Sequence, residues 1–390
     1  MTMTPVATAP ARRDRRARLA VAVTFGVHGV AAGSWAGRIP WVKEVRHLSP
    51  GGLGLALMGA AVGGLLSAPL AAWVISRFGS RAVTRASGLA TAVSLPIVPF
   101  APTVPTIFFA LLMAGVSSGV LDVAMNANGV VVQERYGRSI MSGLHGIWSV
   151  GGLTGSVTAG LAASADLDAT THLVIVGIAL LVVSAVSGFW LIPAPRSSVG
   201  AVFARPDRAL LLLGAVIFFG LFAEAAAADW SAVYLRTVAH AGPAVAAWGY
   251  AAFSLAMAVA RLLGDRLVER LGAARLVRVA ALTGAAGLTL GLLVPVTPVV
   301  IVAFAVLGLG MATVVPLTFS AAGRTPGHDP GTSVAAVATV GYGGWMIAPP
   351  VIGFVAQGTS LTVALALVAV ITALIAVPAR ALGVSDTSRS

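Results

Sequence analysis

Runs of about 20 or more apolar residues recur along almost the whole chain, and they constrain its fold more than any other feature. A helix needs about 20 such residues to cross a bilayer. The chain is 58% hydrophobic and 10% charged, whereas a soluble domain is about 25% charged. The sequence therefore predicts an all-α membrane protein that crosses the bilayer many times.

Prolines and short polar stretches divide these runs into twelve predicted spans. The spans are 18–39, 52–76, 82–101, 105–133, 139–163, 172–192, 209–235, 243–267, 274–294, 297–322, 332–357 and 360–379. Residues 1–17 are predicted to form a disordered basic tail, and residues 380–390 a short cytoplasmic tail. A cytoplasmic linker over residues 193–208 separates two bundles of six spans, 18–192 and 209–379.

Basic residues fall almost entirely on one side of the predicted membrane. With the N-terminus in the cytoplasm, all of the 25 Lys and Arg residues lie on the cytoplasmic side except Arg38, Lys43, Arg46 and Arg236. This asymmetry follows the positive-inside rule. It predicts a protein of the inner membrane with both termini on the cytoplasmic side. Arg261 is expected at the membrane edge, where a long side chain can reach water. Nucleic-acid binding is not indicated, because the basic residues lie in short loops rather than on one compact face.

The two sets of six spans resemble each other at a nearly constant offset of 192 to 195 residues. The matching segments are Ser34-Trp35-Ala36 with Asp229-Trp230-Ser231, Arg77-Phe78-Gly79 with Arg270-Leu271-Gly272, and Ser149-Val150-Gly151-Gly152 with Tyr342-Gly343-Gly344. Weak internal symmetry of this kind indicates two repeated halves. Trp230 is expected as an interfacial aromatic residue, and Arg38 as an outer-edge charge or as a partner of Asp229 across the halves.

Asp122 is a carboxylate in the middle of a predicted span. An ionised side chain in hydrocarbon costs at least a few kcal/mol, so such residues usually face a bundle interior or a water-filled path. Asn126, four residues on, shares a helix face with Asp122, whereas Asn128 lies about 160° further round. We expect Asp122 to carry a proton beside a solute that Asn126 contacts. The alternative is a structural carboxylate bonded to a neighbouring helix.

Other polar residues in the spans give further proton-carrying candidates. Glu224 competes with Asp122 as the proton carrier. His28 suits a proton relay, since an unperturbed imidazole titrates near pH 6.5, or it is a neutral histidine bonded across helices.

Aromatic residues and a second histidine give candidates for solute binding. His145 and Trp148 are expected to contact the solute or to form a packed pair. Tyr342 and Trp345, in the equivalent place of the second half, are expected to stack on a ring or to pack, and Trp35 completes the candidate binding set.

The loop after the eighth span carries the most diagnostic motif. The segment Gly264–Gly272, in which Arg266 follows Asp265, resembles the G-x-x-x-D-R-x-G-R-R signature of the major facilitator superfamily, with altered spacing. Its first copy runs from Ala72 to Arg81 and has Ser76 where the acid is usual. The resemblance implies the twelve-helix major facilitator fold.

The same resemblance implies a gating latch made by Asp265, Arg266, Arg77 and Arg81. An acid at a helix end can pair with basic residues of a neighbouring helix in one conformation and release them in another. A plain cytoplasmic turn with topology-setting arginines is the alternative.

The segments 121–128 and 144–152 resemble bacterial inner-membrane proteins of the YbjJ type and, more distantly, fucose-permease-like sugar–proton symporters. That likeness implies sugar–proton symport through a membrane acid in span 1 or span 4. Asp122 fits the span-4 role by position, whereas span 1 offers His28 instead of an acid.

No enzyme constellation is found in the sequence. It has no G-x-x-x-x-G-K-[ST] phosphate loop, no cluster with metal-ligand spacing and no cysteine, so we expect no cofactor and no metal. We expect a monomeric secondary transporter that moves a small polar solute by alternating access, with protons and the lipid bilayer as its other partners. The predicted mode is proton symport. The alternatives are a proton-coupled exporter of drugs or metabolites, and a non-transporting sensor on the same fold.

Overall fold

All regular structure in the described residues of this computed structural model, 12–136, 140–193, 208–325 and 330–383, is helical. The first half contains α1 (Arg12–Ala36), α2 (Ile39–Val45), α3 (Pro50–Phe78), α4 (Ser80–Ser94), the 3-10 helix η1 (Leu95–Phe100), α5 (Val104–Tyr136), α6 (Met141–Ser164) and α7 (Ala169–Gly188). The second half contains α8 (Arg208–Thr237), α9 (Pro243–Ala246), α10 (Trp248–Leu271), α11 (Ala273–Leu293), α12 (Thr297–Met311), α13 (Val314–Ala322), α14 (Pro330–Gly358), α15 (Leu361–Leu374) and η2 (Pro378–Gly383).

Each predicted span coincides with one long helix or with two consecutive helices. Eleven stretches of the described residues are long and apolar enough to cross a membrane. The remaining predicted span, 139–163, corresponds to α6, which has 24 residues and none of Asp, Glu, Lys or Arg. Its many glycine, serine and threonine residues lower its hydropathy.

Helix α1 begins at Arg12, so residues 12–17 are helical and not part of a disordered tail as predicted. Ala17 is buried, and the guanidinium of Arg18 lies 5.0 Å from the ring centroid of Tyr136 and donates to its hydroxyl across 3.3 Å. These contacts hold the start of α1 against the end of α5. Residues 1–11, residues 194–207 of the predicted linker 193–208, and residues 384–390 lie outside the described residues.

The tenth predicted span is interrupted between α12 and α13, and a proline explains the break. Pro316 has no N–H to donate to the carbonyl of Ala312, four residues earlier. That carbonyl instead accepts a bond of 3.2 Å from Nε of Arg261 on α10. The interruption therefore creates a binding point for a basic side chain inside the second half.

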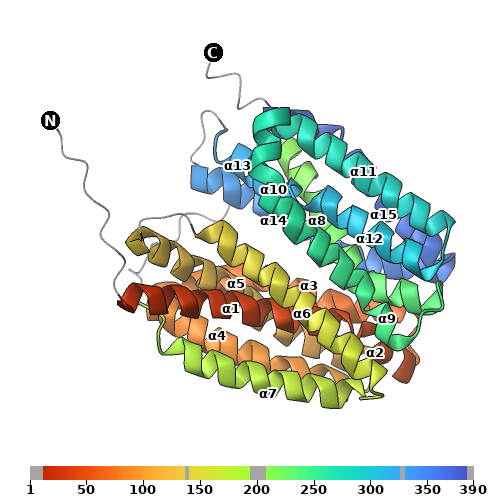
Figure 1. Ribbon diagram of the computed structural model, residues 1–390, viewed down its shortest axis with the longest axis horizontal. Coiled ribbons are helices and arrows are strands. Elements are labelled where there is room, and N and C mark those ends of the chain that lie inside the picture. The colour runs from red at the N-terminus through yellow and green to blue at the C-terminus, as the bar shows by residue number, and fades with distance from the viewer. Residues whose placement is uncertain (1–11, 137–139, 194–207, 326–329, 384–390) are drawn as a thin grey trace.

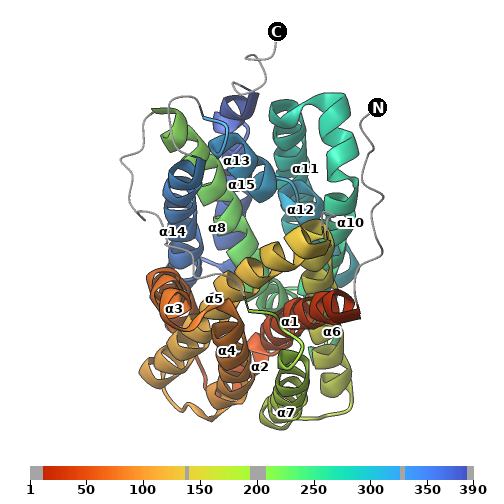
Figure 2. The ribbon, with the colours of Figure 1, turned by 90° about the vertical axis from the view of Figure 1, so that its left-hand side faces the viewer.

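The helices form two bundles, with α1–α7 in one and α8–α15 in the other (Figures 1 and 2). Glycines bring the backbones of neighbouring helices together within each bundle. An ideal Cβ on Gly33 of α1 would overlap the carbonyl group of Gly152 on α6, 2.8 Å from its carbon atom. The backbones of α1 and α6 thus touch directly.

We expect Gly33→Ala and Gly146→Ala to change stability in opposite directions. At Gly33 the added methyl forces α1 and α6 apart, and overpacking costs typically about 1–3 kcal/mol. At Gly146 an added Cβ meets nothing within 4 Å, so the variant gains up to about 1 kcal/mol from the better helix former. Apparent melting temperatures of the two purified variants test this, and equal values would contradict the close α1–α6 contact.

The two bundles meet at one end of the molecule, right in Figure 1. There Gln357 Oε1 of α14 accepts from the amide of Gly51 across 3.0 Å and from the hydroxyl of Ser49 across 3.2 Å. Nε of Arg236 on α8 lies 2.6 Å from a carboxylate oxygen of Glu44 on α2. We call this the closed end. The opposite end, left in Figure 1, carries the α3–α4 and α10–α11 turns, and we call it the arginine-rich end.

The contact between the bundles is lost towards the arginine-rich end. On α14, a Cβ at Gly353 would lie 2.6 Å from a carbonyl oxygen of α3, whereas Tyr342, three turns away on the same face, is 42% exposed. On α6, a Cβ at Gly160 would lie 2.9 Å from a carbonyl oxygen of α9, whereas at Gly146, four turns away, it meets nothing. The structure is therefore closed at one end and open at the other.

A continuous apolar core seals the closed end. Ile39, Val42 and Leu53 of the first bundle belong to the same buried cluster as Trp230 and Val233 of the second. The other buried clusters of the described residues contain residues of the first bundle alone. Trp230 is fully buried in the shared cluster, so its prediction as an interfacial aromatic residue is wrong.

Candidate functional site

His28 lies near the middle of α1 and joins three helices through its imidazole. The indole Nε1–H of Trp148 on α6 donates to His28 Nδ1 across 2.9 Å, and His28 Nε2 lies 2.6 Å from the hydroxyl of Ser118 on α5. Because an indole N–H can only donate, Nδ1 is the acceptor, and Nε2 carries the proton and donates it to Ser118. In this conformation His28 is a neutral imidazole that holds Trp148 in place.

Trp148 also lines a small cavity between the bundles. The cavity is about 20 Å³, enough for about one water molecule. It is lined by Trp148, Ser149, Glu224, Tyr250, Phe253, Ser254, Met257 and Trp345. Trp148 and Trp345, predicted from the sequence as equivalent positions of the two halves, are therefore brought together around one space.

Glu224 of α8 faces Arg261 of α10 beside this cavity. One carboxylate oxygen lies 3.9 Å from a terminal nitrogen of Arg261, and the two side chains are 13% and 25% exposed. The same oxygen is buried without a hydrogen-bond partner. Arg261 lies within the last turn of the apolar stretch Pro243–Gly264, in agreement with the predicted position at the membrane edge. Its side chain contacts the carboxylate of Glu224 and the carbonyl freed by Pro316 rather than extending freely to water.

Asp122 is half-buried on α5 and bonds to its own helix. The amide of Asn126 donates to the backbone oxygen of Asp122 across 2.8 Å and to its carboxylate across 3.2 Å. In the part of the chain that the structure describes, no basic side chain forms an ion pair with Asp122. Its carboxylate lies within electrostatic range of His28 on α1 and of Tyr342 on α14. Among the described residues, the side-chain partner of the Asp122 carboxylate is therefore Asn126 of its own helix.

Asn128 points to a different side of α5, as the helical spacing predicted. It is fully buried, and its amide donates to the hydroxyl of Ser80 across 3.2 Å and to the backbone oxygen of Ile192 across 2.9 Å. Asn128 therefore ties α5 to the start of α4 and to the segment after α7.

His145 and Trp35 lie away from the cavity. His145 is exposed towards the arginine-rich end, where its Nδ1 donates to the carbonyl of Met141 across 3.0 Å and its ring packs 5.2 Å from that of Phe25. It does not form the predicted packed pair with Trp148. Trp35 is half-buried and packs against the apolar cluster shared by both bundles and against one of the first bundle.

Arg38 is buried within the first bundle and does not contact Asp229. Its Nε lies 3.3 Å from Nδ1 of His172 on α7, and its terminal nitrogen donates to the carbonyl of Leu167 across 3.1 Å. The predicted pair with Asp229 is not formed. Arg38 lies just past the end of α1 and beside the turn between α6 and α7, as an outer-edge position requires, but its side chain is buried. The acceptors on and before α7 could not be read from the local sequence.

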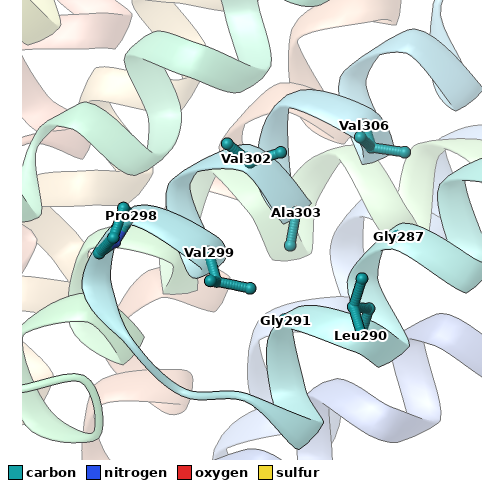
Figure 3. A pocket seen from close by; sticks show the side chains of 8 residues that line it. All are labelled: Gly287, Leu290, Gly291, Pro298, Val299, Val302, Ala303 and Val306. Carbon is teal, nitrogen blue, oxygen red and sulfur yellow. The ribbon is translucent and has the colours of Figure 1, made fainter.

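The larger cavity of about 280 Å³ lies elsewhere, between α11 and α12 (Figure 3). Its lining is wholly apolar: Gly287, Leu290, Gly291, Pro298, Val299, Val302, Ala303 and Val306. Leu290 and Val302 are more than half exposed. A groove of this chemistry on the outer face of a membrane bundle suits lipid tails and offers a polar solute no partner.

Comparison with known proteins settles the family. The chain is 33% identical over 360 residues to an uncharacterised MFS-type transporter of Yersinia pestis, covering 92% of this chain and 94% of that protein. The chain belongs to the major facilitator superfamily. The model of this superfamily matches residues 210–389, and the fold, with two bundles of transmembrane helices, confirms the predicted fold class.

Two rhizobial proteins and two solved structures of transporters are also similar to this chain. An uncharacterised transporter of Sinorhizobium fredii is 32% identical, over 92% of this chain and 96% of its own, and the membrane protein MosC of Rhizobium meliloti is 31% identical, over 88% and 84%. Among solved structures, a mutant of the nucleoside transporter NupG has a TM-score of 0.78 at 11% identity, covering 94% of this chain and 99% of its own. A D-xylose–proton symporter has a TM-score of 0.73 at 13% identity, covering 93% and 96%. The family is one of transporters rather than enzymes.

The superfamily signature loops lie at the arginine-rich end. Arg77 is exposed beside the ring of Phe78, and Arg81 donates to the carbonyl of Phe189 at the end of α7 across 3.4 Å. Arg266 is exposed, and the side chain of Asp265 lies outside what the structure describes. Because Arg77 and Arg81 contact only their own bundle here, the latch stays a prediction for the conformation that closes this end.

Proposed function

We propose that this chain is a secondary transporter that moves a small polar solute across the cytoplasmic membrane by alternating access, in symport with protons. The observation that carries the proposal is the polar and aromatic cavity at mid-depth between the bundles, sealed towards one end and adjoining the open end. Midplane sites between repeated halves are typical of such transporters. The likeness to the D-xylose–proton symporter supports symport of a hydroxylated solute.

In this proposal the small cavity widens so that the solute sits between the indoles of Trp148 and Trp345, while Tyr342, His145 and Asn126 line its route from the open end. Trp35 contributes by sealing the closed end. Aromatic faces pack against the apolar faces of a ring, and the few polar groups of the cavity fix its orientation. Rocking of the bundles would carry the site from one side to the other.

Asp122 is the proposed proton carrier, and Glu224 takes a different part. A carboxylate inside a membrane needs a partner, water or a proton. Glu224 has a guanidinium beside it, whereas Asp122 has only the amide of Asn126 among the described residues. Uptake of a proton therefore removes the charge of Asp122. The site can then pass through conformations in which it is closed to both sides of the membrane.

The positive-inside rule supports an orientation in which the arginine-rich end and both termini face the cytoplasm. The present conformation is then open to the cytoplasm. The chain is proposed to act as a monomer in the inner membrane.

We expect Asp122→Asn to lose proton-driven accumulation of solute while keeping counterflow exchange. A solute is first identified by a thermal-shift screen of sugars, acids and amphipathic drugs on the purified protein. Uptake is then measured in vesicles with and without an imposed pH gradient. Glu134→Gln, an exposed acid on the same helix, should behave like the unmodified protein.

Accumulation that is unchanged in Asp122→Asn would refute the role of this residue. Vesicles of known orientation distinguish the other functions. Proton-driven movement out of the cytoplasmic side would identify an exporter, and the lack of any solute flux would identify a sensor.

A further inference from the structure

We propose that protonation of His28 and the present position of Trp148 exclude each other, so that His28 is a positioning residue for the cavity wall. The two nitrogens of His28 are both engaged. Nδ1 accepts from Trp148 across 2.9 Å, and Nε2 donates to Ser118 across 2.6 Å. Nδ1 is therefore the nitrogen with a lone pair, and any further proton must bind there.

A proton can bind Nδ1 only after the indole N–H has left it. If Nδ1 of His28 and Nε1 of Trp148 both carried a hydrogen, the two nitrogens, 2.9 Å apart, would both be donors and neither could accept. A buried indole N–H needs a partner, so Trp148 must turn towards another acceptor or towards water. The step forms an N–H bond at Nδ1 of His28 and breaks an O–H bond of the donor, which is water or a neighbouring carboxyl group. The proton returns to that oxygen when Trp148 binds Nδ1 again.

The turning of Trp148 changes the cavity, because its indole is one wall and Trp345 is another. Occupation of the cavity and protonation of His28 are thus linked through a single side chain. A role of this link in coupling proton movement to solute movement rests on the proposed function. The exclusion itself is a property of the folded chain and needs neither a solute nor a gradient.

Few charged groups of the helices packed against α1 act on His28. Asp122 of α5 acts on it electrostatically. The other titratable groups are engaged or lie further away: His145 of α6 beside Phe25, Arg85 of α4 on the ring of Phe189, His172 of α7 with Arg38 of α1 itself, and Glu224 of α8 and Arg261 of α10 across the cavity.

The test is a pH titration of Trp148 by ¹⁹F NMR on the full chain in detergent, with 5-fluorotryptophan at its eight tryptophans. Trp148→Phe and Trp345→Phe assign the two cavity resonances. As the pH is lowered from about 8 through and below the range in which exposed histidines titrate, we expect the Trp148 resonance to shift and its H₂O/D₂O isotope effect to grow as the indole meets water. The Trp345 resonance should shift less.

Variants of His28 decide the cause. Both His28→Asn and His28→Gln should abolish the titration of Trp148, whereas His145→Asn, a histidine of the same helix as Trp148, should keep it. A Trp148 resonance that is independent of pH in the unmodified protein would overturn the proposal without any variant. A titration that persists in the His28 variants would overturn it as well.

Discussion

Gly54→Leu should shift the protein towards a conformation open at the closed end and should abolish transport. A Cβ at Gly54 of α3 would lie 2.5 Å from the carbonyl oxygen of Pro349 and 3.1 Å from Cα of Gly353 on α14. The clash exists only while the two bundles meet there. An overpacking cost of about 1–3 kcal/mol corresponds to roughly a 5- to 140-fold change in the conformational equilibrium, at about 1.4 kcal/mol per tenfold.

The absence of cysteine from the chain makes this shift easy to measure. Ala247→Cys places a single thiol at a buried position beside Gly37 and Gly160 at the closed end, on the other side of the interface from α3. Maleimide should label this thiol slowly in Ala247→Cys alone, and at least about fivefold faster when Gly54→Leu is also present.

Gly64→Leu is the matched control for this experiment. It lies on the same helix, and a Cβ there meets nothing within 4 Å, so labelling should stay slow. Slow labelling with Gly54→Leu would mean that the bundles do not separate as rigid bodies.

Arg261→Met should cost both stability and transport, because it leaves the carboxylate of Glu224 without its partner inside the membrane. Removing one member of a largely buried ion pair costs about 3 kcal/mol or more. The apparent melting temperature should fall by several degrees. Arg266→Met, an exposed arginine further along the same helix, should melt like the unmodified protein.

The double variant Glu224→Gln with Arg261→Met separates stability from function. It contains neither charge, so stability should return towards that of the unmodified protein, as buried ion pairs often contribute little net stability. Transport should stay lost, because the cavity lacks both charged groups. A single Arg261→Met variant that melts normally would show that the two side chains are not coupled.

The helices could be predicted from the sequence because the bilayer imposes a length and an apolar composition on each of them. All twelve runs therefore coincide with helices. The start of α1 and the break after α12 could not be placed by hydropathy alone. In the first case Tyr136 holds the helix end, and in the second Pro316 frees a carbonyl group within an otherwise apolar run.

The candidate site was predictable where helical periodicity decides it and unpredictable where partners come from other helices. The spacing of Asp122, Asn126 and Asn128 predicted that the first two share a face. The internal repeat pointed to Trp148 and Trp345. By contrast, Arg261 looked like one more arginine of a basic loop, since its partners, Glu224 and the carbonyl of Ala312, lie on α8 and after α12.

The apolar core shared by the bundles gives the closed end a temperature dependence. Opening that end would expose the apolar side chains of Ile39, Leu53 and Trp230 to water. Exposure of apolar surface to water has a positive heat-capacity change. Hydrophobic contacts weaken on cooling, so cold should loosen this seal before it affects the ion pair at the same end. The equilibrium between the conformations open to one or the other side of the membrane would then differ between a cold cell and a warm one.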